Sequence, residues 1–433
     1  MNAGSKRILI VGGGFVGMYS ALGLKGAARA GHAVTVVNPE NFMQYQPFLP
    51  EVASGTIDAR AVVVPLRRVL PHAEVLIGEV EVIDHGARRA TVRMPEGRIE
   101  ELDYDIVVLG AGSRSRVLPV PGLAEYGVGF KTVQEAIYLR NRVLSRLDVA
   151  AEADDPERLR SALTFVFVGG GYAGVEALGE LEDLARDAIR NYPMLRRERM
   201  RWVLVEAAGK ILPELGEDLA VYAKRRLRER GIEILLNTRL ESAEGAVLRL
   251  SDGQEFAADT LVWTAGVKAS PLPGRSGFPV DEAGRVRVDR YLRVQGVDGA
   301  WAAGDAAAVP DLTIGGLCPP TAQHALRQAR RLAANLAATI EGRPLEPFVY
   351  RTIGGVCSLG RYKGVANVMG VKLKGFPGWF VHRTYHLLAM PTLMRRVRIA
   401  LDWTVALAFP RDIAQLGSLE HPREPFERAA EGR

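Results

Sequence analysis

Apolar and polar positions follow two kinds of pattern along this chain of 433 residues. Short runs of β-branched and large apolar residues at 6–12 and 164–169 indicate strands buried on both faces, as in parallel sheets. Apolar positions at helical spacing follow at 16–31 and 175–192, and another apolar run follows each of these stretches. The order strand, helix, strand predicts one β-α-β unit in each half of the chain, and therefore an α/β fold.

Three glycines join the first strand to the first helix in the pattern GxGxxG: Gly12, Gly14 and Gly17. The first glycine permits a tight turn, the second lets the backbone approach a pyrophosphate, and the third allows close contact of helix and strand. The free N–H groups and the positive dipole end of the helix then face the phosphates. The motif alone is weak evidence, but its place between strand and helix makes it a strong indication of a dinucleotide site.

The same pattern recurs between the second strand and its helix, at Gly169, Gly171 and Gly174. The next strand, 201–206, ends in Glu206. A carboxylate there accepts hydrogen bonds from an adenosine ribose and repels a 2′-phosphate, so it favours NADH over NADPH. The alternative is a strand-end Glu that is simply exposed.

Asn38 ends the strand after the first helix, where an acidic residue is expected. Its amide oxygen can still accept a ribose hydrogen bond, although without charge assistance. The alternative is a turn-forming Asn before Pro39.

Two dinucleotide sites imply two dinucleotides, and a tightly held flavin is the natural acceptor for a hydride from a nicotinamide. Strand-and-glycine segments at 104–122, 259–271 and 299–310 fit this interpretation. The last of them places Gly304 and Asp305 after an apolar run, where an Asp can bind the ribitol hydroxyls of FAD. Because Gly-Asp pairs are common in turns, this pair supports the flavin only together with the glycine motifs.

Bulk composition is that of a globular protein of two or three domains, with 48% hydrophobic residues and no uninterrupted apolar run of membrane-spanning length. The N-terminus leads directly into a strand, so we expect no signal peptide and a cytosolic protein. Cys318 and Cys357 form neither a CxxC pair nor a disulfide framework, which argues against a disulfide reductase. No pattern of metal ligands is visible, so we expect no metal site.

Charge is distributed unevenly, because the 347–401 span contains nine Lys and Arg residues and no Asp or Glu. Pro391 divides its end into two short helices, and in the second an apolar stripe lies opposite Arg395, Arg398 and Asp402. Such a basic amphipathic region favours binding in a membrane surface. A helix for domain packing or dimerisation is the alternative, and the two are compatible. We do not expect nucleic-acid binding, because no recognition module accompanies the charge.

Taken together, these features resemble the two-dinucleotide-binding flavoproteins, and more narrowly the type II NADH dehydrogenases, over nearly the whole chain. The narrower marks are NFMQYQPFLPEVASG (41–55), GGGYAGVE (169–176), VWTAGV (262–267) and CPPTAQHALRQA (318–329). In the family the last motif reads AQxAxQQ, whereas this chain has Arg327 in place of the first closing Gln. Sulfide:quinone oxidoreductases share the scaffold, but they need reactive cysteines and lack a second intact nucleotide turn.

The resemblance implies roles for particular residues. Glu176 would lie near the nicotinamide and the flavin and deliver a proton or position the substrate, although acidic residues are also preferred in a first helical turn. Gln323 would lie beside the flavin and the quinone, whereas the neighbouring His324 is more typical of packing or surface. The expected quinone site comprises Gln46, Pro47, Gln323 and Arg327. The expected contacts with FAD are Gly12, Gly14, Gly17, Asn38, Gly112, Gly304, Asp305 and Ala322. The expected contacts of the second dinucleotide site, for NADH, are Gly169, Gly171, Gly174, Glu206 and Gly266.

The expected protein is a non-proton-pumping NADH:quinone oxidoreductase with FAD, on the inner face of the cell membrane. The resemblance implies an FAD domain, 1–118 with 287–370, an inserted NAD domain, 119–286, and a membrane-associating and dimerising tail, 371–433. Hydride would pass from NADH to FAD, and two electrons would then pass to menaquinone or ubiquinone. Two alternatives stay open: an enzyme that reduces oxygen or a small soluble carrier, and a redox-responsive membrane scaffold with negligible turnover.

Overall fold

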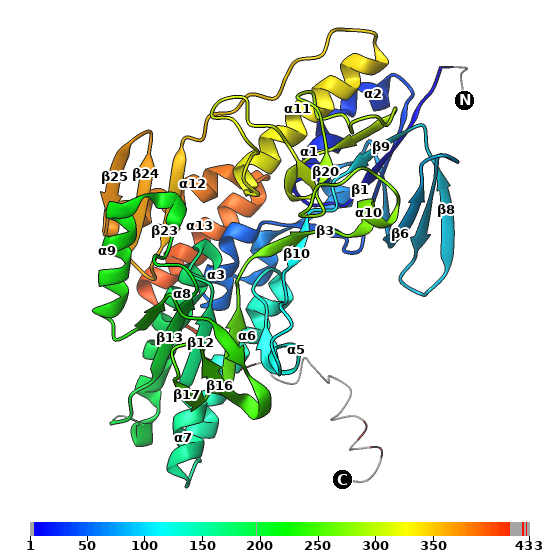
Figure 1. The fold of residues 1–433 in the computed structure, drawn as a ribbon. Helices are drawn as coiled ribbons and strands as arrows, with labels where there is room; N and C mark the ends of the chain where they lie inside the picture. The colour runs from blue at the N-terminus through cyan, green and yellow to red at the C-terminus, as the bar shows by residue number, and fades with distance from the viewer. Residues whose placement is uncertain (1–3, 196, 416–426, 428–429, 431–433) are drawn as a thin grey trace. The chain divides into compact units, whose positions relative to one another are not determined.

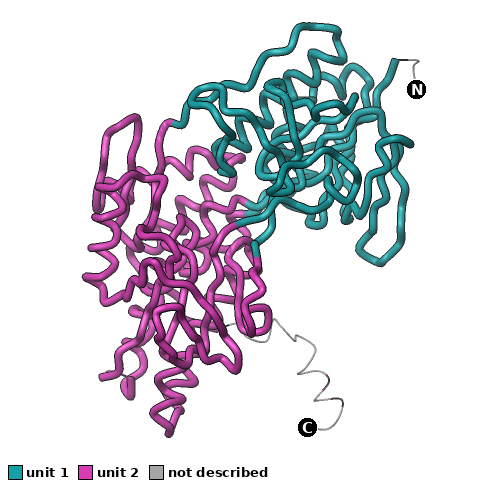
Figure 2. The backbone as a smooth tube through the Cα atoms, in the orientation of Figure 1, with its two compact units in different colours: residues 1–44, 63–116, 267–352 teal, residues 45–62, 117–266, 353–433 magenta. Residues whose placement is uncertain are grey.

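A computed structural model describes residues 4–195, 197–415, 427 and 430 of the chain (Figure 1). The chain forms two compact units, which Figure 2 distinguishes by colour. Unit 1 comprises residues 1–44, 63–116 and 267–352, and unit 2 comprises residues 45–62, 117–266 and 353–433.

Unit 1 is built on a parallel sheet with the strand order β21-β9-β1-β2-β5. Its strands are β1 (Arg7–Val11), β2 (Ala33–Asn38), β5 (Glu74–Ile77), β9 (Ile106–Leu109) and β21 (Ala300–Ala302). Helix α1 (Phe15–Gly23) follows β1 and packs closely on α11 (Ala322–Ile340), where Gly23 meets Ala333. The apolar run of the first strand is buried, because helices and neighbouring strands cover it.

Smaller elements complete unit 1. Three short pairs are β3 (Phe42–Gln44) with β4 (Val63–Pro65), β10 (Ser113–Ser115) with β19 (Val267–Ala269), and β20 (Val286–Arg287) with β22 (Ala307–Ala308). An antiparallel sheet contains β6 (Glu79–Asp84), β7 (Arg89–Arg93) and β8 (Ile99–Asp103). The remaining short helices are α2 (Lys25–Arg29), α4 (Leu66–Val69) and α10 (Leu272–Arg275).

Unit 2 contains a second parallel sheet, with the order β11-β18-β12-β13-β14. The strands are β11 (Gly127–Val128), β12 (Thr164–Val168), β13 (Arg201–Glu206), β14 (Glu233–Leu236) and β18 (Thr260–Trp263). Its helices are α3 (Leu49–Ala53), α5 (Leu123–Tyr126), α6 (Val133–Ala151), α7 (Pro156–Ala162), α8 (Tyr172–Ala188) and α9 (Glu217–Arg228). A small sheet of β15 (Leu240–Ser242), β16 (Val247–Leu250) and β17 (Glu255–Ala257) joins the same apolar core. The expected α/β fold with two Rossmann-like units is therefore confirmed.

The last part of unit 2 begins with an antiparallel sheet of β23 (Gly354–Ser358), β24 (Gly364–Val368) and β25 (Val371–Lys374). This sheet packs on α8 and α9, and Gly179 of α8 lets the backbone at Leu359 approach closely. Helices α12 (Phe376–Ala389) and α13 (Leu393–Ala408) follow, separated at Pro391 as the sequence predicts.

Three segments belong to a different unit from the one that the predicted domain boundaries give them. Residues 45–62 and 353–370 belong to unit 2, because α3 and β23 pack on α8, whereas 267–286 belong to unit 1, because β19 pairs with β10. The tail likewise joins unit 2 through α12, which packs on β23 and β24. The assignment of FAD and NAD to particular domains stays a prediction.

The two C-terminal helices expose much apolar surface, including Leu393, Leu401 and Val405 of α13. Met390 and Trp379, in contrast, are buried by packing within unit 2. None of the helices in the described ranges is long and apolar enough to cross a membrane. Residues from 416 onward, apart from 427 and 430, lie outside the described residues.

Candidate functional site

The first glycine loop has the geometry that its motif predicts. Gly12 has φ of +97°, a left-handed conformation that favours glycine, and a Cβ there would press on the carbonyl of Gly110. A Cβ on Gly17 would overlap the carbonyl oxygen of Gly12, so the close approach of helix α1 to the turn requires glycine. A Cβ on Gly14, in contrast, would meet no atom within 4 Å. The backbone at Gly14 is therefore open to a phosphate group.

The second loop repeats these features in unit 2. Gly169 has φ of +117°, a Cβ on Gly174 would overlap the carbonyl oxygen of Gly169, and Gly171 again has open space beside it. Both α1 and α8 begin at a glycine without a side-chain cap. The first N–H groups of a helix need acceptors, and phosphate oxygens can supply them at both loops. The two loops thus fit two dinucleotides.

Asn38 and Glu206 make equivalent contacts in the two units. The N–H of Gly13 donates to Oδ1 of Asn38 over 2.7 Å, and the N–H of Gly170 donates to Oε2 of Glu206 over 2.5 Å. Oε1 of Glu206 also accepts from the N–H of Ala208 at 2.7 Å. Each side chain therefore orients its glycine loop, and both carboxylate oxygens of Glu206 retain lone pairs for a ribose. The ribose contacts themselves stay predictions.

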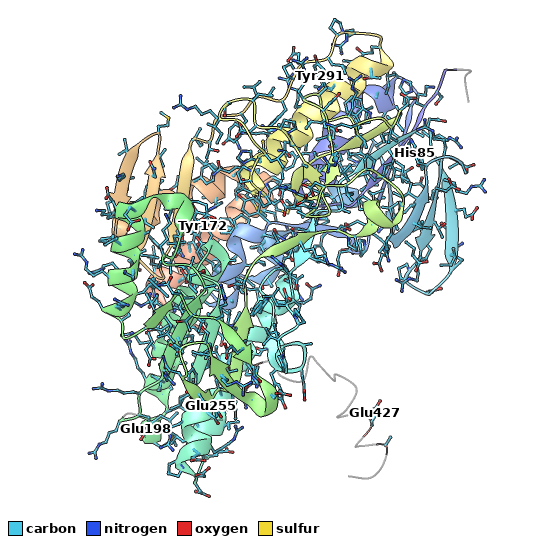
Figure 3. All side chains as sticks on the ribbon, viewed as in Figure 1. His85, Tyr172, Glu198, Glu255, Tyr291 and Glu427 are labelled. Atoms are coloured by element: carbon cyan, nitrogen blue, oxygen red, sulfur yellow. The ribbon has the colours of Figure 1, made fainter. Side chains whose placement is uncertain are left out.

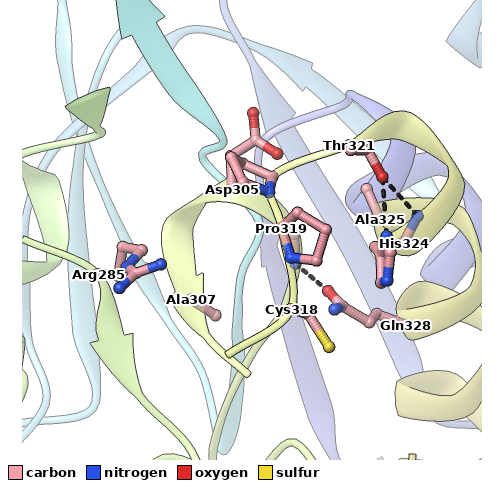
Figure 4. Close-up of a pocket in the computed structure, with 11 residues that line it drawn as sticks. Arg285, Asp305, Ala307, Cys318, Pro319, Thr321, His324, Ala325 and Gln328 are labelled. Carbon is pink, nitrogen blue, oxygen red and sulfur yellow. Dashed lines mark hydrogen bonds between the residues drawn. The ribbon is translucent and has the colours of Figure 1, made fainter. Parts of the chain in front are cut away.

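Asp305 lies at a small pocket of unit 1, shown in Figure 4. Ser113 donates a hydrogen bond of 2.6 Å to Oδ2 of Asp305, and the N–H of Gly304 donates one of 2.8 Å to Gln328. Thr321 caps α11 by accepting the N–H of His324. This arrangement brings Asp305 to the first turn of α11, whose first residue is Ala322. Gly112 has positive φ and open space beside it, as does Gly266 in unit 2.

Tyr350 organises the predicted AQ segment. Its hydroxyl donates to Oε1 of Gln323 at 2.9 Å, and its ring lies 4.3 Å from the guanidinium of Arg327. Arg327 also donates to the backbone oxygen of Gln323 over 3.0 Å. His324 is buried with its ring edge against the same tyrosine, and burial lowers its pKa, which fits the packing role. Tyr350 was missed in the sequence, because no motif marks it.

Gln46 and Pro47, also predicted for the quinone site, lie in a short 3-10 helix (η1, Gln46–Phe48) of unit 2. The Gln46 side chain is exposed and donates to the backbone oxygen of Lys131 at 3.3 Å. Gln323 and Arg327 belong to unit 1. A quinone site formed by all four residues therefore stays a prediction.

Glu176 lies in the first turns of α8, which begins at Tyr172 (Figure 3). Its side chain is buried, and Oε1 accepts the N–H of Ser358 at 2.9 Å and lies 3.0 Å from Nε2 of His382. These partners from β23 and α12 are far away in the sequence. Glu176 thus has a specific buried environment that a preference for acidic residues at helix starts does not explain.

The two cysteines are free and buried. Burial raises the pKa of the Cys318 thiol to about 11, and it raises that of Cys357 well above the usual value. Both therefore remain protonated at neutral pH, whereas thiol chemistry needs the thiolate. Among the residues that the structure describes, no three His, Cys, Asp or Glu side chains are grouped as metal ligands.

Comparison with known proteins identifies the family. The model of the pyridine nucleotide-disulphide oxidoreductases matches residues 6–329. The type II NADH:quinone oxidoreductase Ndh of Mycobacterium tuberculosis is 31% identical over 420 residues, which cover 94% of this chain and 89% of that protein. The chain belongs to the type II NADH:quinone oxidoreductases. This confirms the family that the sequence resembles.

Another curated protein is similar over most of the chain, and solved structures share its fold. Demethylphylloquinone reductase NdbB of Synechocystis is 30% identical over 92% of this chain and 95% of that protein. The fold of NDH2 from Plasmodium falciparum, solved in complex with NADH, matches 95% of this chain and all of that chain with a TM-score of 0.87 at 18% identity. The sulfide:quinone oxidoreductase of Aquifex aeolicus shares the fold more distantly, with a TM-score of 0.71 at 16% identity.

Proposed function

We propose that this chain oxidises NADH and reduces a membrane quinone, with FAD as the bound cofactor and without proton pumping. The proposal rests on two intact glycine loops in a chain of the type II family. Each loop leads into a helix that begins without a side-chain cap. FAD supplies the chemistry of the reaction, because it accepts a hydride and passes electrons on to a quinone.

The loop of unit 1 would hold the FAD pyrophosphate, and Asp305 would bind its ribitol hydroxyls. Ser113 orients that carboxylate, and Gln328 fixes the backbone beside it. The loop of unit 2 would hold NADH, with Glu206 on the adenosine ribose. Glu206 is anchored by two backbone N–H groups, so its charge is held where a 2′-phosphate would be repelled.

Quinone would contact Gln323 and Arg327, and the family resemblance adds Gln46 and Pro47 as quinone contacts. Tyr350 supports this assignment, since it holds both the Gln323 amide and the Arg327 guanidinium. An Arg at this position places a fixed positive charge where relatives carry an amide, and that charge can stabilise electron density on a quinone oxygen.

The chain would lie on the inner face of the cell membrane as a homodimer. The exposed apolar side chains of α13, on a helix that also exposes Arg398, support a surface-bound helix rather than a spanning one. Because a lipophilic quinone dissolves in the bilayer, contact of the protein with the bilayer would give the quinone direct access to its site.

Anaerobic stopped-flow absorbance tests the function. The purified protein is mixed with NADH, and the reduced protein is then mixed with a menaquinone or ubiquinone analogue. We expect the flavin absorbance to bleach rapidly with NADH and to recover rapidly with quinone. Recovery with oxygen or a soluble carrier but not with quinone would show the alternative enzyme, and bleaching without recovery by any acceptor would indicate a scaffold.

A further inference from the structure

A line of buried and partly buried polar side chains runs through unit 2 from α8 to the start of η1. It begins at Glu176, whose Oε1 lies 3.0 Å from Nε2 of His382 on α12. His382 and His386 are four positions apart on that helix, so their rings share a face and meet at a centroid distance of 4.8 Å. Nδ1 of His386 then lies 3.2 Å from the hydroxyl of Tyr45.

We propose that Tyr45, His386 and His382 form a proton relay that connects Glu176 with the quinone end of the site. Tyr45 directly precedes Gln46, the residue proposed to contact quinone. The relay rests on the proposed function, because it needs a quinone that accepts protons along with electrons.

The stoichiometry of the reaction requires such a proton. NADH, quinone and one proton from solvent give NAD and quinol, so the hydride supplies both electrons and only one of the two hydrogens. In the relay the O–H bond of Tyr45 breaks as the O–H bond of quinol forms. His386 returns a proton to the tyrosine oxygen, His382 resupplies His386, and Glu176 resupplies His382 with a proton taken from water.

The environment of His382 suits a group that holds a proton between turnovers. The ring is only 2% exposed. Burial opposes its charge, but the hydrogen bond and charge of Glu176, with the charges of Glu51 and Glu180, raise its pKa above the usual value. Among the described residues, neither buried ring nitrogen of His382 has a partner in hydrogen-bond geometry, but Nε2 lies within ion-pair distance of Glu176, so Nδ1 is the atom left to pass the proton on.

His386 differs from His382 in the way that a relay requires. Loss of solvation and the nearby positive charge of His382 lower its pKa well below the usual value, so the ring is neutral at rest. A neutral imidazole can accept a proton at one nitrogen and release one at the other. Transfer from His382 needs one of the two rings to turn, because the rings meet edge to face at 69°.

Other titratable and charged groups also face this line. Around His382 they are Glu176 and Glu180 of α8, Glu51 of α3, Cys357 of β23, and Arg383 on α12 itself. Cys357 remains a thiol, and Arg383 is paired with Glu51. Along this line, the surrounding carboxylates raise the pKa of His382, whereas the pKa of His386 is lowered.

Two activities of the full-length protein with bound FAD separate proton delivery from electron transfer. A quinone analogue consumes protons on reduction, whereas ferricyanide accepts electrons alone. We expect Tyr45→Phe and His382→Gln to lower kcat with quinone by roughly 10²-fold, the usual contribution of a positioned acid, and to leave NADH:ferricyanide activity within about twofold of wild type. Tyr385→Phe is the matched control, because Tyr385 contacts the His386 ring from another side and should keep both activities.

Three further measurements would not change if these side chains had only a structural role. The quinone activity of wild type should fall as pH rises through the raised pKa of His382, and His382→Gln should lose this dependence. Tyr45→Phe should change the solvent isotope effect on quinone reduction. His386→Ala should regain quinone activity when imidazole is added, since His386 is only partly buried.

The outcomes distinguish the relay from the function on which it rests. Failure of the wild-type protein to reduce quinone would refute the proposed function. An active wild type with Tyr45→Phe behaving like Tyr385→Phe would refute the relay alone. Equal loss of quinone and ferricyanide activity in every relay variant would assign these side chains to folding and would also refute the relay.

Discussion

Arg383 donates a hydrogen bond of 3.0 Å to the carboxylate of Glu51, and both side chains are buried. The guanidinium lies between the rings of Trp379 and Trp403, at 4.3 and 4.5 Å from their centroids. Trp403 also donates its indole N–H to the same Glu51 oxygen at 2.6 Å. One buried carboxylate on α3 therefore holds both C-terminal helices through planar groups that stack on one another.

This arrangement predicts a large stability effect. Arg383→Leu leaves the Glu51 charge buried and unpaired, so we expect the free energy of unfolding to fall by about 3–5 kcal/mol. Adding Glu51→Gln should recover part of the loss, because the double variant has no isolated charge. Chemical denaturation followed by tryptophan fluorescence measures both effects. Lys372→Ala, which breaks the exposed pair with Asp218, serves as the control and should change stability little.

The glycine loops predict separate losses of the two dinucleotides. Gly17→Ala should purify with little FAD, and Gly174→Ala should retain FAD but lose NADH binding, because each new Cβ would collide with a carbonyl of its own loop. Absorbance of the purified protein measures FAD, and titration with NADH measures the second site. Gly26→Ala in α2 is the control, since its Cβ would meet no atom within 4 Å. If Gly174→Ala lost FAD instead, the assignment of the two domains would be reversed.

Glu206 predicts the choice of nicotinamide cofactor. Glu206→Gln keeps an acceptor for the N–H of Gly170 but removes the charge that repels a 2′-phosphate. We expect the ratio of kcat/KM for NADPH to that for NADH to rise roughly tenfold, the effect of one charge-assisted hydrogen bond of about 1.5 kcal/mol. Glu233→Gln on the next strand should leave the ratio unchanged. An unchanged ratio in both variants would indicate a strand-end Glu without contact to the cofactor.

Asp259 predicts a stability difference that depends on pH. Burial opposes its charge, but hydrogen bonds from Arg146 and Arg158 lower its pKa below the usual value. A carboxyl group with a lowered folded-state pKa stabilises the fold above its unfolded-state pKa, and this stability is lost as pH falls through the folded-state pKa. Asp259→Asn should therefore be less stable than wild type at pH 7, and the difference should shrink below about pH 4. Denaturation of both proteins at several pH values measures it, and a constant difference would contradict the ion-pair origin.

The apolar stripe of α13 predicts attachment to lipid. Leu401→Glu should lower binding to vesicles of phosphatidylglycerol and phosphatidylcholine by at least about tenfold, because burying a Leu side chain contributes about 1.5–3 kcal/mol. Sedimentation with the vesicles measures binding, and NADH:ferricyanide activity should not change. Val221→Glu, at another exposed apolar position, on α9, is the control. If Leu401→Glu changed the oligomeric state and not vesicle binding, the stripe would be a dimer interface.

The sequence by itself determined the features that depend on residues adjacent in the chain. Each GxGxxG loop needs its glycines for reasons local to one turn, namely positive φ at Gly12 and Gly169 and close carbonyl contacts at Gly17 and Gly174. The strands before the loops are buried on both faces, so their composition also marks them. Pro391 separates two helices because it cannot continue the first.

Only the tertiary structure decided which distant side chains share an environment. Trp379 and Phe380 are adjacent aromatic residues, yet packing against β24 buries Trp379 and leaves Phe380 exposed. Glu176 was identified by its motif, but its partners His382 and Ser358 come from a segment that folds back on α8. Such contacts depend on how separate elements pack, and the packing sets the pKa of each histidine. Carboxylates around His382 raise its pKa against the effect of burial, whereas burial lowers the pKa of His386.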